Sequence, residues 1–190
     1  MEKTLISETR NENNLKTKMS IVRYGNVMFS RGSVIPLFLD QIKKNQEITI
    51  TDKEMTRFLL SLDDAIDLVL FAISSDDNGS IFIKKAQACK ILNLAEVLLK
   101  IFNKKNKIKI IGTRHGEKIH ETLATSAELR ISQDHKEYFK VPSDKRSLNY
   151  KSYYDEGVKK SLVNDYSSDL AKNLNNKELE KLLRSFSDIK

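Results

Sequence analysis

Two polar loops hold the residues best suited to bind a phosphate-bearing ligand. The first runs from Gly25-Asn26 to Gly32-Ser33, and the second is Thr113-Arg114-His115-Gly116-Glu117-Lys118. Glycine allows a backbone or a ligand to approach closely, and the Asn26 amide can both donate and accept hydrogen bonds. The Arg114 guanidinium can bind a phosphate through two parallel hydrogen bonds. Two plainer interpretations stay open: a glycine-rich turn at a helix start, and a surface ion pair between Arg114 and Glu117.

Arg57 is a third candidate, because it lies between apolar residues in Met55-Thr56-Arg57-Phe58. An arginine in apolar surroundings often has an anionic partner. About as often, only its aliphatic stem packs there while its charged head reaches water. The spacing alone does not decide between these two interpretations.

The remaining reactive residue types form no recognisable site. His115, His120 and His135 do not have the spacing of zinc ligands, and with one cysteine in the chain we expect no metal site. Cys89 lies beside apolar helix formers with no histidine close in sequence, which predicts a small buried residue. The stretch 136–160 mixes aromatic and basic residues that could stack on single-stranded nucleic acid, but packing as a surface lid is the favoured interpretation.

The composition is typical of a globular protein with a buried core. The chain has 190 residues, of which 39% are hydrophobic, and its net charge is +7. That charge suits a phosphate-bearing partner, although surface lysines alone also explain it. No apolar run reaches the roughly 18 residues of a membrane span, and the charged start does not resemble a secretory signal. Together with the single cysteine, this predicts a cytoplasmic protein that does not enter a membrane.

Strands alternate with helices up to about residue 125, which predicts an α/β fold with mainly parallel strands. We expect strands at 19–24, 47–51, 81–84 and 107–111, and helices at 1–12, from 34, from 61 and at 91–102. In the helix from residue 34, Val34, Leu37, Phe38 and Ile42 should share the packed face. Residues 126–170 have weak periodicity and are predicted to be an irregular tail. A last helix should begin at Asn175, which Glu178 can help to cap.

Four ordered blocks give the sequence a specific resemblance. RYGNVMFSRGSVIPLF, EITITDKEMTRFLLSLDDAIDLVLFA, IFIKKAQA and IIGTRHGEKIHETL resemble the C-terminal half of polysaccharide-biosynthesis nucleotide-sugar enzymes of the CapD, CapE and PseB type. These are extended short-chain dehydrogenase/reductase relatives with an NAD(P)-binding Rossmann-type fold. The resemblance implies two parts: 1–125 is the substrate-side α/β portion, and 126–190 is a polysaccharide-biosynthesis tail with a terminal helix.

The resemblance also implies a function for the whole enzyme. Such enzymes oxidise a UDP-sugar, such as UDP-N-acetylglucosamine, to a 4-keto intermediate with NADP or NAD. They then act as 4,6-dehydratases or 4-epimerases in the synthesis of capsule or lipopolysaccharide O-antigen. By resemblance, Asn26 contacts the nucleotide sugar, Arg57 and Arg114 hold the UDP pyrophosphate, and Glu117 lies near the nucleotide. The cofactor carries the hydride, and the protein supplies orientation and proton transfer.

The sequence also departs from this family. It contains neither a glycine-rich dinucleotide loop nor a Tyr-x-x-x-Lys or Met-x-x-x-Lys pair, so we expect no catalytic residue in it and no binding of NADP or NAD by this chain alone. A bulky Phe29 stands where the family usually has a small residue, and we expect it to crowd the pocket. Two hypotheses follow: a substrate-binding part that acts with a separately encoded Rossmann half, and a non-catalytic remnant or basic binding module. Whether the chain forms a homo-oligomer is left open.

Overall fold

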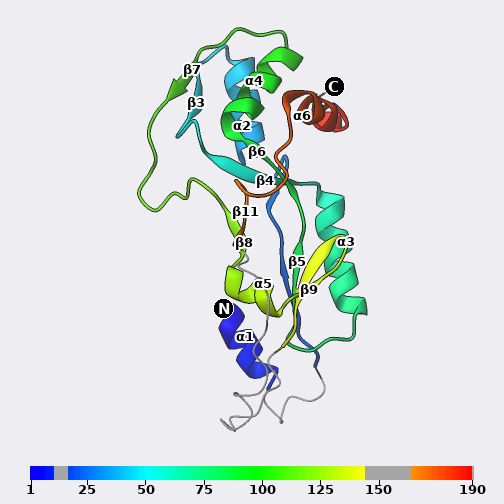
Figure 1. The fold of residues 1–190 in the computed structure, drawn as a ribbon. Helices are drawn as coiled ribbons and strands as arrows, with labels where there is room; N and C mark the ends of the chain where they lie inside the picture. The colour runs from blue at the N-terminus through cyan, green and yellow to red at the C-terminus, as the bar shows by residue number, and fades with distance from the viewer. Residues whose placement is uncertain (11–16, 144–163, 190) are drawn as a thin grey trace. The chain divides into compact units, whose positions relative to one another are not determined.

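The computed structural model describes residues 1–10, 17–143 and 164–189 (Figure 1). Contacts divide the chain into two compact units, each assembled from three stretches that interleave along the sequence. The first unit takes Met1–Tyr24, Asp63–Lys85 and Leu123–Tyr166, and the second takes Gly25–Leu62, Ala86–Thr122 and Ser167–Lys190. The division of the chain into 1–125 and 126–190 that the sequence suggested stays a prediction.

The first unit is a sheet with helices on both faces. Its strands have the order β1 (Ile21–Arg23), β5 (Ile81–Lys84), β10 (Tyr138–Val141) and β9 (Gln133–Asp134). Strands β1 and β5 are parallel, whereas β10 runs antiparallel to β5. Helices α1 (Glu2–Glu8) and α5 (Ser126–Ile131) cover one face, and α3 (Leu62–Ser74) covers the other. The alternation of side chains along a strand explains the two faces, because Phe82 points to α3 while its neighbours Ile81 and Ile83 point to the opposite core.

The prediction of an irregular segment after residue 125 is wrong for 126–143. Thr125 and Glu128 form a reciprocal capping box that starts α5, and β10 pairs along its whole length with β5. Val141 is buried in the core of the first unit. The β10 pairing partner lies more than fifty residues away in sequence, so local periodicity could not reveal it. Tyr150, Tyr153 and Tyr154, which suggested a nucleic-acid surface, lie outside the described residues.

The second unit packs three helices against short strands. Helices α2 (Val34–Lys43), α4 (Ile91–Ile101) and α6 (Asn176–Arg184) share a core with β3, and α4 contacts both of the other helices (Figure 1). Strand β4 (Thr56–Leu60) runs parallel to β2 (Asn26–Val27) and antiparallel to β6 (Gln87–Lys90). Strand β3 (Ile48–Ile50) runs parallel to β7 (Ile108–Ile110). The described chain also forms β8 (Thr122–Ala124), β11 (Tyr166–Ser167) and a last 3-10 turn at Ser187–Ile189.

The helices of this unit follow the local sequence signals, with one exception. Asn175 accepts hydrogen bonds from the backbone of Lys177 and Glu178, which confirms the predicted cap of α6. The predicted packed face of α2 is only partly right. Phe38 and Ile42 are buried, but Leu37 is 48% exposed and Ile35 and Leu39 take its place in the core.

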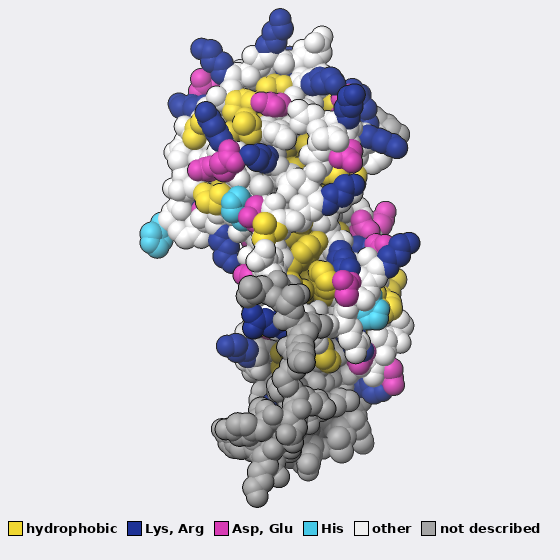
Figure 2. Space-filling model, in the orientation of Figure 1, with side chains coloured by type: hydrophobic (Ala, Val, Ile, Leu, Met, Phe, Trp, Pro, Cys, Tyr) yellow, Lys and Arg dark blue, Asp and Glu magenta, His cyan; other side chains and the backbone are white. Residues whose placement is uncertain are grey.

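The chain is therefore α/β, with parallel pairs extended by antiparallel strands. No helix in the described part is long and apolar enough to cross a membrane. Figure 2 shows basic side chains spread over the visible face with acidic ones between them, rather than in one continuous band. That distribution agrees with the plain interpretation of the net charge as surface lysines.

Candidate functional site

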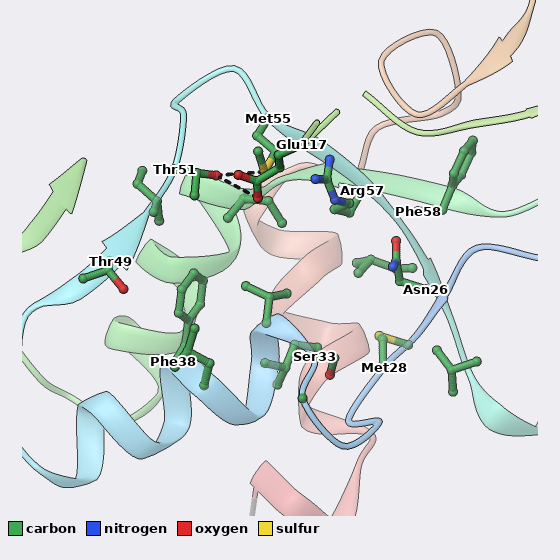
Figure 3. A pocket seen from close by; sticks show the side chains of 18 of the residues that line it. Asn26, Met28, Ser33, Phe38, Thr49, Thr51, Met55, Arg57, Phe58 and Glu117 are labelled. Atoms are coloured by element: carbon green, nitrogen blue, oxygen red, sulfur yellow. Dashed lines mark hydrogen bonds between the residues drawn. The ribbon is translucent and has the colours of Figure 1, made fainter. Parts of the chain in front are cut away.

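The second unit contains a cavity of about 300 Å³. Its walls come from β2, the start of α2, the end of β3, strand β4 and the loop that follows β7 (Figure 3). Leu37, which is exposed, lines this cavity together with Val34 on the same helix. Much of the lining is apolar, with polar groups placed at a few points, as is usual for small-molecule sites.

All four residues that the sequence singled out for ligand binding line this one cavity. Asn26 comes from β2, Arg57 from β4, and Arg114 and Glu117 from the loop after β7. Figure 3 shows the Glu117 carboxylate turned toward the Thr51 hydroxyl. The fold thus brings together three segments that are far apart in sequence, although the roles assigned to these residues stay predictions.

The Arg57 guanidinium is held mainly by backbone oxygens. Nη1 donates to the carbonyls of Thr56 (2.7 Å) and Ile119 (3.0 Å), and Nη2 donates to that of Lys118 (2.9 Å). Nε lies 3.6 Å from a carboxylate oxygen of Glu121, and the side chain is 14% exposed. A guanidinium has five N–H groups, so one on Nη2 is left without a partner among the described residues. Among the described residues Arg57 thus has one anionic partner, Glu121, and three backbone carbonyls.

Glu117 and Arg114 interact, but not as the surface ion pair that was one alternative. The Glu117 carboxylate accepts a hydrogen bond from the backbone N–H of Arg114 at 3.0 Å and lies 3.5 Å from the Thr51 hydroxyl. The Arg114 guanidinium is exposed and makes no hydrogen bond or ion pair with any described residue. The loop is therefore closed by Glu117, while the charge of Arg114 remains available at the cavity.

The first candidate loop ends at the amino end of α2, and there the structure adds a detail that the sequence could not show. Ser33 lines the cavity at the N-cap position, but its hydroxyl makes no capping bond. This hydroxyl oxygen is buried and has no hydrogen-bond partner in the part of the chain that the structure describes. The first N–H groups of a helix lack internal acceptors and favour negative charge. The Gly32-Ser33 sequence signalled the helix start, and only the fold shows that this start opens into the cavity.

Two residues of the loop from Gly25 to Ser33, Gly25 and Phe29, pack against other parts of the protein. Gly25 packs so tightly that a Cβ there would lie 2.3 Å from the Phe58 Cβ, so the expected close backbone approach is made to the protein itself. The expectation that Phe29 crowds the pocket is wrong. Phe29 does not line the cavity, and its ring lies 4.9 Å from the ring of Phe186 near the end of the chain. Its backbone has a φ of 61°, which turns the side chain toward that partner.

Two other reactive side chains, Cys89 and His120, are not among the residues that line the cavity. Cys89 is fully buried, and burial raises the pKa of its thiol to about 12. His120 lies 2.8 Å from the Thr56 hydroxyl through Nδ1. The described part of the chain contains no group of three or more acidic, histidine or cysteine side chains that could hold a metal ion.

Two strand-to-helix connections among the described residues lack the glycine loop of a dinucleotide site. Such a site needs a glycine loop between a strand and the start of a helix. Helix α3 follows β4 directly and starts with Asp63 and Asp64 in its first turn, which repel phosphate. Helix α4 follows β6 at Ile91 without a glycine.

Comparison with known families accounts for the whole chain. Residues 1–143 match the family described as polysaccharide biosynthesis protein, and residues 144–190 match the family described as polysaccharide biosynthesis protein C-terminal. A UDP-glucose 4-epimerase from Rickettsia rickettsii (strain Sheila Smith) is 50% identical over 184 residues, which cover 96% of this chain and 54% of that protein. The chain thus spans about half the length of the curated relatives it matches.

Two solved structures illustrate the similarity in fold. Pen from Bacillus thuringiensis superposes with a TM-score of 0.83 and 35% identity, over 97% of this chain and 54% of that one. A dTDP-glucose 4,6-dehydratase from Bacillus anthracis, solved in complex with NAD, superposes with a TM-score of 0.53 and 11% identity. That match covers 60% of this chain and 37% of the dehydratase, and it supports the fold alone.

Proposed function

Because this chain belongs to the polysaccharide biosynthesis protein family, we propose that it is the substrate-side part of a UDP-sugar 4-epimerase and that its cavity binds the UDP-sugar. One observation carries the proposal: the four residues predicted to contact this ligand come from three distant segments and line a single cavity. The relative that is 50% identical is a UDP-glucose 4-epimerase, which favours epimerisation over 4,6-dehydration.

The charges around the cavity support a diphosphate ligand. Arg114 offers a guanidinium that has no partner among the described residues, and the start of α2 offers backbone N–H groups and the Ser33 hydroxyl. Phosphates bind well both to arginine and to helix amino ends. The one carboxylate among the lining residues, Glu117, is turned to the Arg114 backbone and the Thr51 hydroxyl, so these bonds offset its repulsion of an anion.

The size of the cavity sets a limit on what it can enclose. Its volume of about 300 Å³ is at the lower end of the roughly 300–1,000 Å³ of small-molecule sites. The proposal is therefore that it encloses part of the ligand, with Asn26 toward the sugar and Arg114 on the diphosphate. The family resemblance implies NAD or NADP, and we propose that this cofactor is bound outside the described residues, by a Rossmann half supplied with this chain or made separately.

Calorimetric titration of the chain with UDP tests the proposal. We expect Arg114→Ala to weaken binding by about tenfold, since it removes a charge-assisted contact to phosphate. Arg130→Ala is the matched control, because Arg130 is an exposed arginine on α5 in the other unit. Equal affinity in the wild type, Arg114→Ala and Arg130→Ala, or no binding of UDP by the wild type, would contradict the proposal.

A further inference from the structure

A chain of hydrogen bonds crosses the second unit at Ser168. The Ser168 hydroxyl lies 2.6 Å from that of Thr56, which lies 2.8 Å from Nδ1 of His120. The backbone N–H of Glu121 donates to the Ser168 hydroxyl at 2.9 Å, and the Glu121 carbonyl accepts from the Ser168 backbone at 2.8 Å. Ser168 is fully buried and Thr56 is 3% exposed, so water does not compete for these bonds.

These bonds join the two segments that supply the arginines of the cavity. Thr56 immediately precedes Arg57 on β4, and Glu121 ends the loop that contains Arg114. Arg57 in turn binds the Lys118 carbonyl in this same loop. The loop is therefore attached to β4 directly, by Arg57 and by the Thr56 N–H, which donates to the Ile119 carbonyl at 3.0 Å, and also through the serine behind it.

Ser168 comes from the C-terminal part of the chain, which matches a different family model from the rest. The segment that contains Ser168 is anchored to the second unit by two backbone hydrogen bonds, one to the N–H and one to the carbonyl of Ala88. The Ala88 N–H donates to the Lys172 carbonyl at 2.9 Å, and the Leu174 N–H donates to the Ala88 carbonyl at 2.8 Å. This segment thus adds to the edge of β6 and presents Ser168 from a fixed position.

The Ser168 hydroxyl is needed whichever way the donors run. With Nδ1 of His120 unprotonated, Glu121 N–H donates to Ser168, Ser168 to Thr56, and Thr56 to His120. With Nδ1 protonated, the side-chain donors reverse and the Ser168 hydroxyl donates to the Thr56 carbonyl, 3.2 Å away. In both arrangements, removal of this hydroxyl leaves the Glu121 N–H without its acceptor.

We infer that Ser168 is a positioning residue through which the C-terminal segment holds the loop 112–121 against β4 and so sets the affinity of the cavity for a diphosphate. The affinity part rests on the proposed function, whereas the attachment of the loop can be measured without any ligand. Ser168 lines no cavity wall, so its effect on a ligand must pass through Thr56 and the loop.

Amide hydrogen exchange on the full chain tests the attachment. In Ser168→Ala we expect the Arg114 and Glu117 amides, which do not contact Ser168, to exchange about tenfold faster. UDP affinity should fall by about tenfold. Ser168→Thr keeps the hydroxyl and should restore both values toward wild type. Ser132→Ala is the matched control, because Ser132 is a buried serine in the other unit whose hydroxyl donates to the Leu129 carbonyl.

The two measurements separate the possible failures. Unchanged exchange at Arg114 and Glu117 in a folded Ser168→Ala overturns the positioning role, whatever happens to UDP. Faster exchange with unchanged UDP affinity overturns the link to the cavity. If the wild type does not bind UDP, the proposed function fails, and the exchange rates alone decide whether Ser168 holds the loop. Thr56→Val removes the hydroxyl that joins Ser168 to His120, with little change in volume, so it tests that link if Ser168→Ala does not fold.

Discussion

The Nη2 atom of Arg57 lies 2.9 Å from the carbonyl oxygen of Lys118, so a strand side chain fixes the backbone of the loop that contains the second arginine of the cavity. The two arginines therefore have different environments. Arg57 is 14% exposed and bonded to three backbone carbonyls, whereas Arg114 is exposed and has no partner among the described residues. Their substitutions should differ in effect on stability as well as on binding.

Arg57→Ala should lower the free energy of unfolding by about 1–3 kcal/mol, because it leaves the Lys118 carbonyl without its donor and removes one of the two donors to the Ile119 carbonyl. Arg114→Ala should change it by less than about 0.5 kcal/mol, as expected for an exposed side chain. Urea denaturation of both variants measures the difference. Equal losses in the two variants would show that Arg57 does not hold the loop.

Gly25→Ala should destabilise the chain by about 3 kcal/mol, because the new Cβ would overlap the Phe58 Cβ, which is attached to β4 and cannot move away freely. Gly32→Ala is the comparison. Gly32 has a φ of 77° but open space around it, so only backbone strain of about 1 kcal/mol applies. Thermal or urea unfolding ranks the two variants, and a smaller loss for Gly25→Ala than for Gly32→Ala would contradict the close approach.

The pair of Arg23 and Glu128 should make stability depend on pH. Burial acts to raise the pKa of Glu128, but hydrogen bonds from Arg23, at 2.8 Å, and from Thr125 outweigh it and hold the pKa below its ordinary value of 4.5. A carboxyl with a lowered pKa stabilises the fold above its ordinary value, and this contribution disappears as the pH falls through the lowered pKa.

Glu128→Gln should therefore be less stable than the wild type at pH 7, and the difference should shrink as the pH is lowered below about 4.5. Urea unfolding at a series of pH values measures this trend. Glu180→Gln is not a suitable control, because Glu180 also pairs with Lys100 and Arg184. Glu96→Gln, on an exposed carboxylate of α4, should show no comparable trend. A constant difference for Glu128→Gln from pH 7 to pH 3 would rule out the pairing as its cause.

Cys89 should not react with iodoacetamide in the folded protein at pH 8. Its side chain is fully buried and the pKa of its thiol is about 12, so both access and the reactive thiolate are lacking. Unfolding in urea should restore rapid alkylation, which mass spectrometry detects. Rapid alkylation without urea would show that β6 opens readily or that the thiol is not buried.

The sequence by itself determined the elements whose signals are local. The stretches at 81–84, 91–102 and 107–111 form β5, α4 and β7, and the Asn175 and Glu178 cap starts α6. The sequence predicts these elements correctly because helix periodicity and capping depend on residues within a few positions of one another. The ordered blocks also pointed to the family that the comparison identifies.

Only the tertiary structure decided which groups meet. Arg57 finds its carbonyl partners some sixty residues away, Phe29 turns to Phe186 instead of the cavity, and β10 joins the central sheet of its unit. Thr56 and Ser168 are 112 residues apart in sequence, yet their hydroxyls are 2.6 Å apart. A serine in a polar stretch carries no local sign of such a partner. Its burial and its hydrogen bonds arise only when strand pairing and helix packing bring the distant segments together.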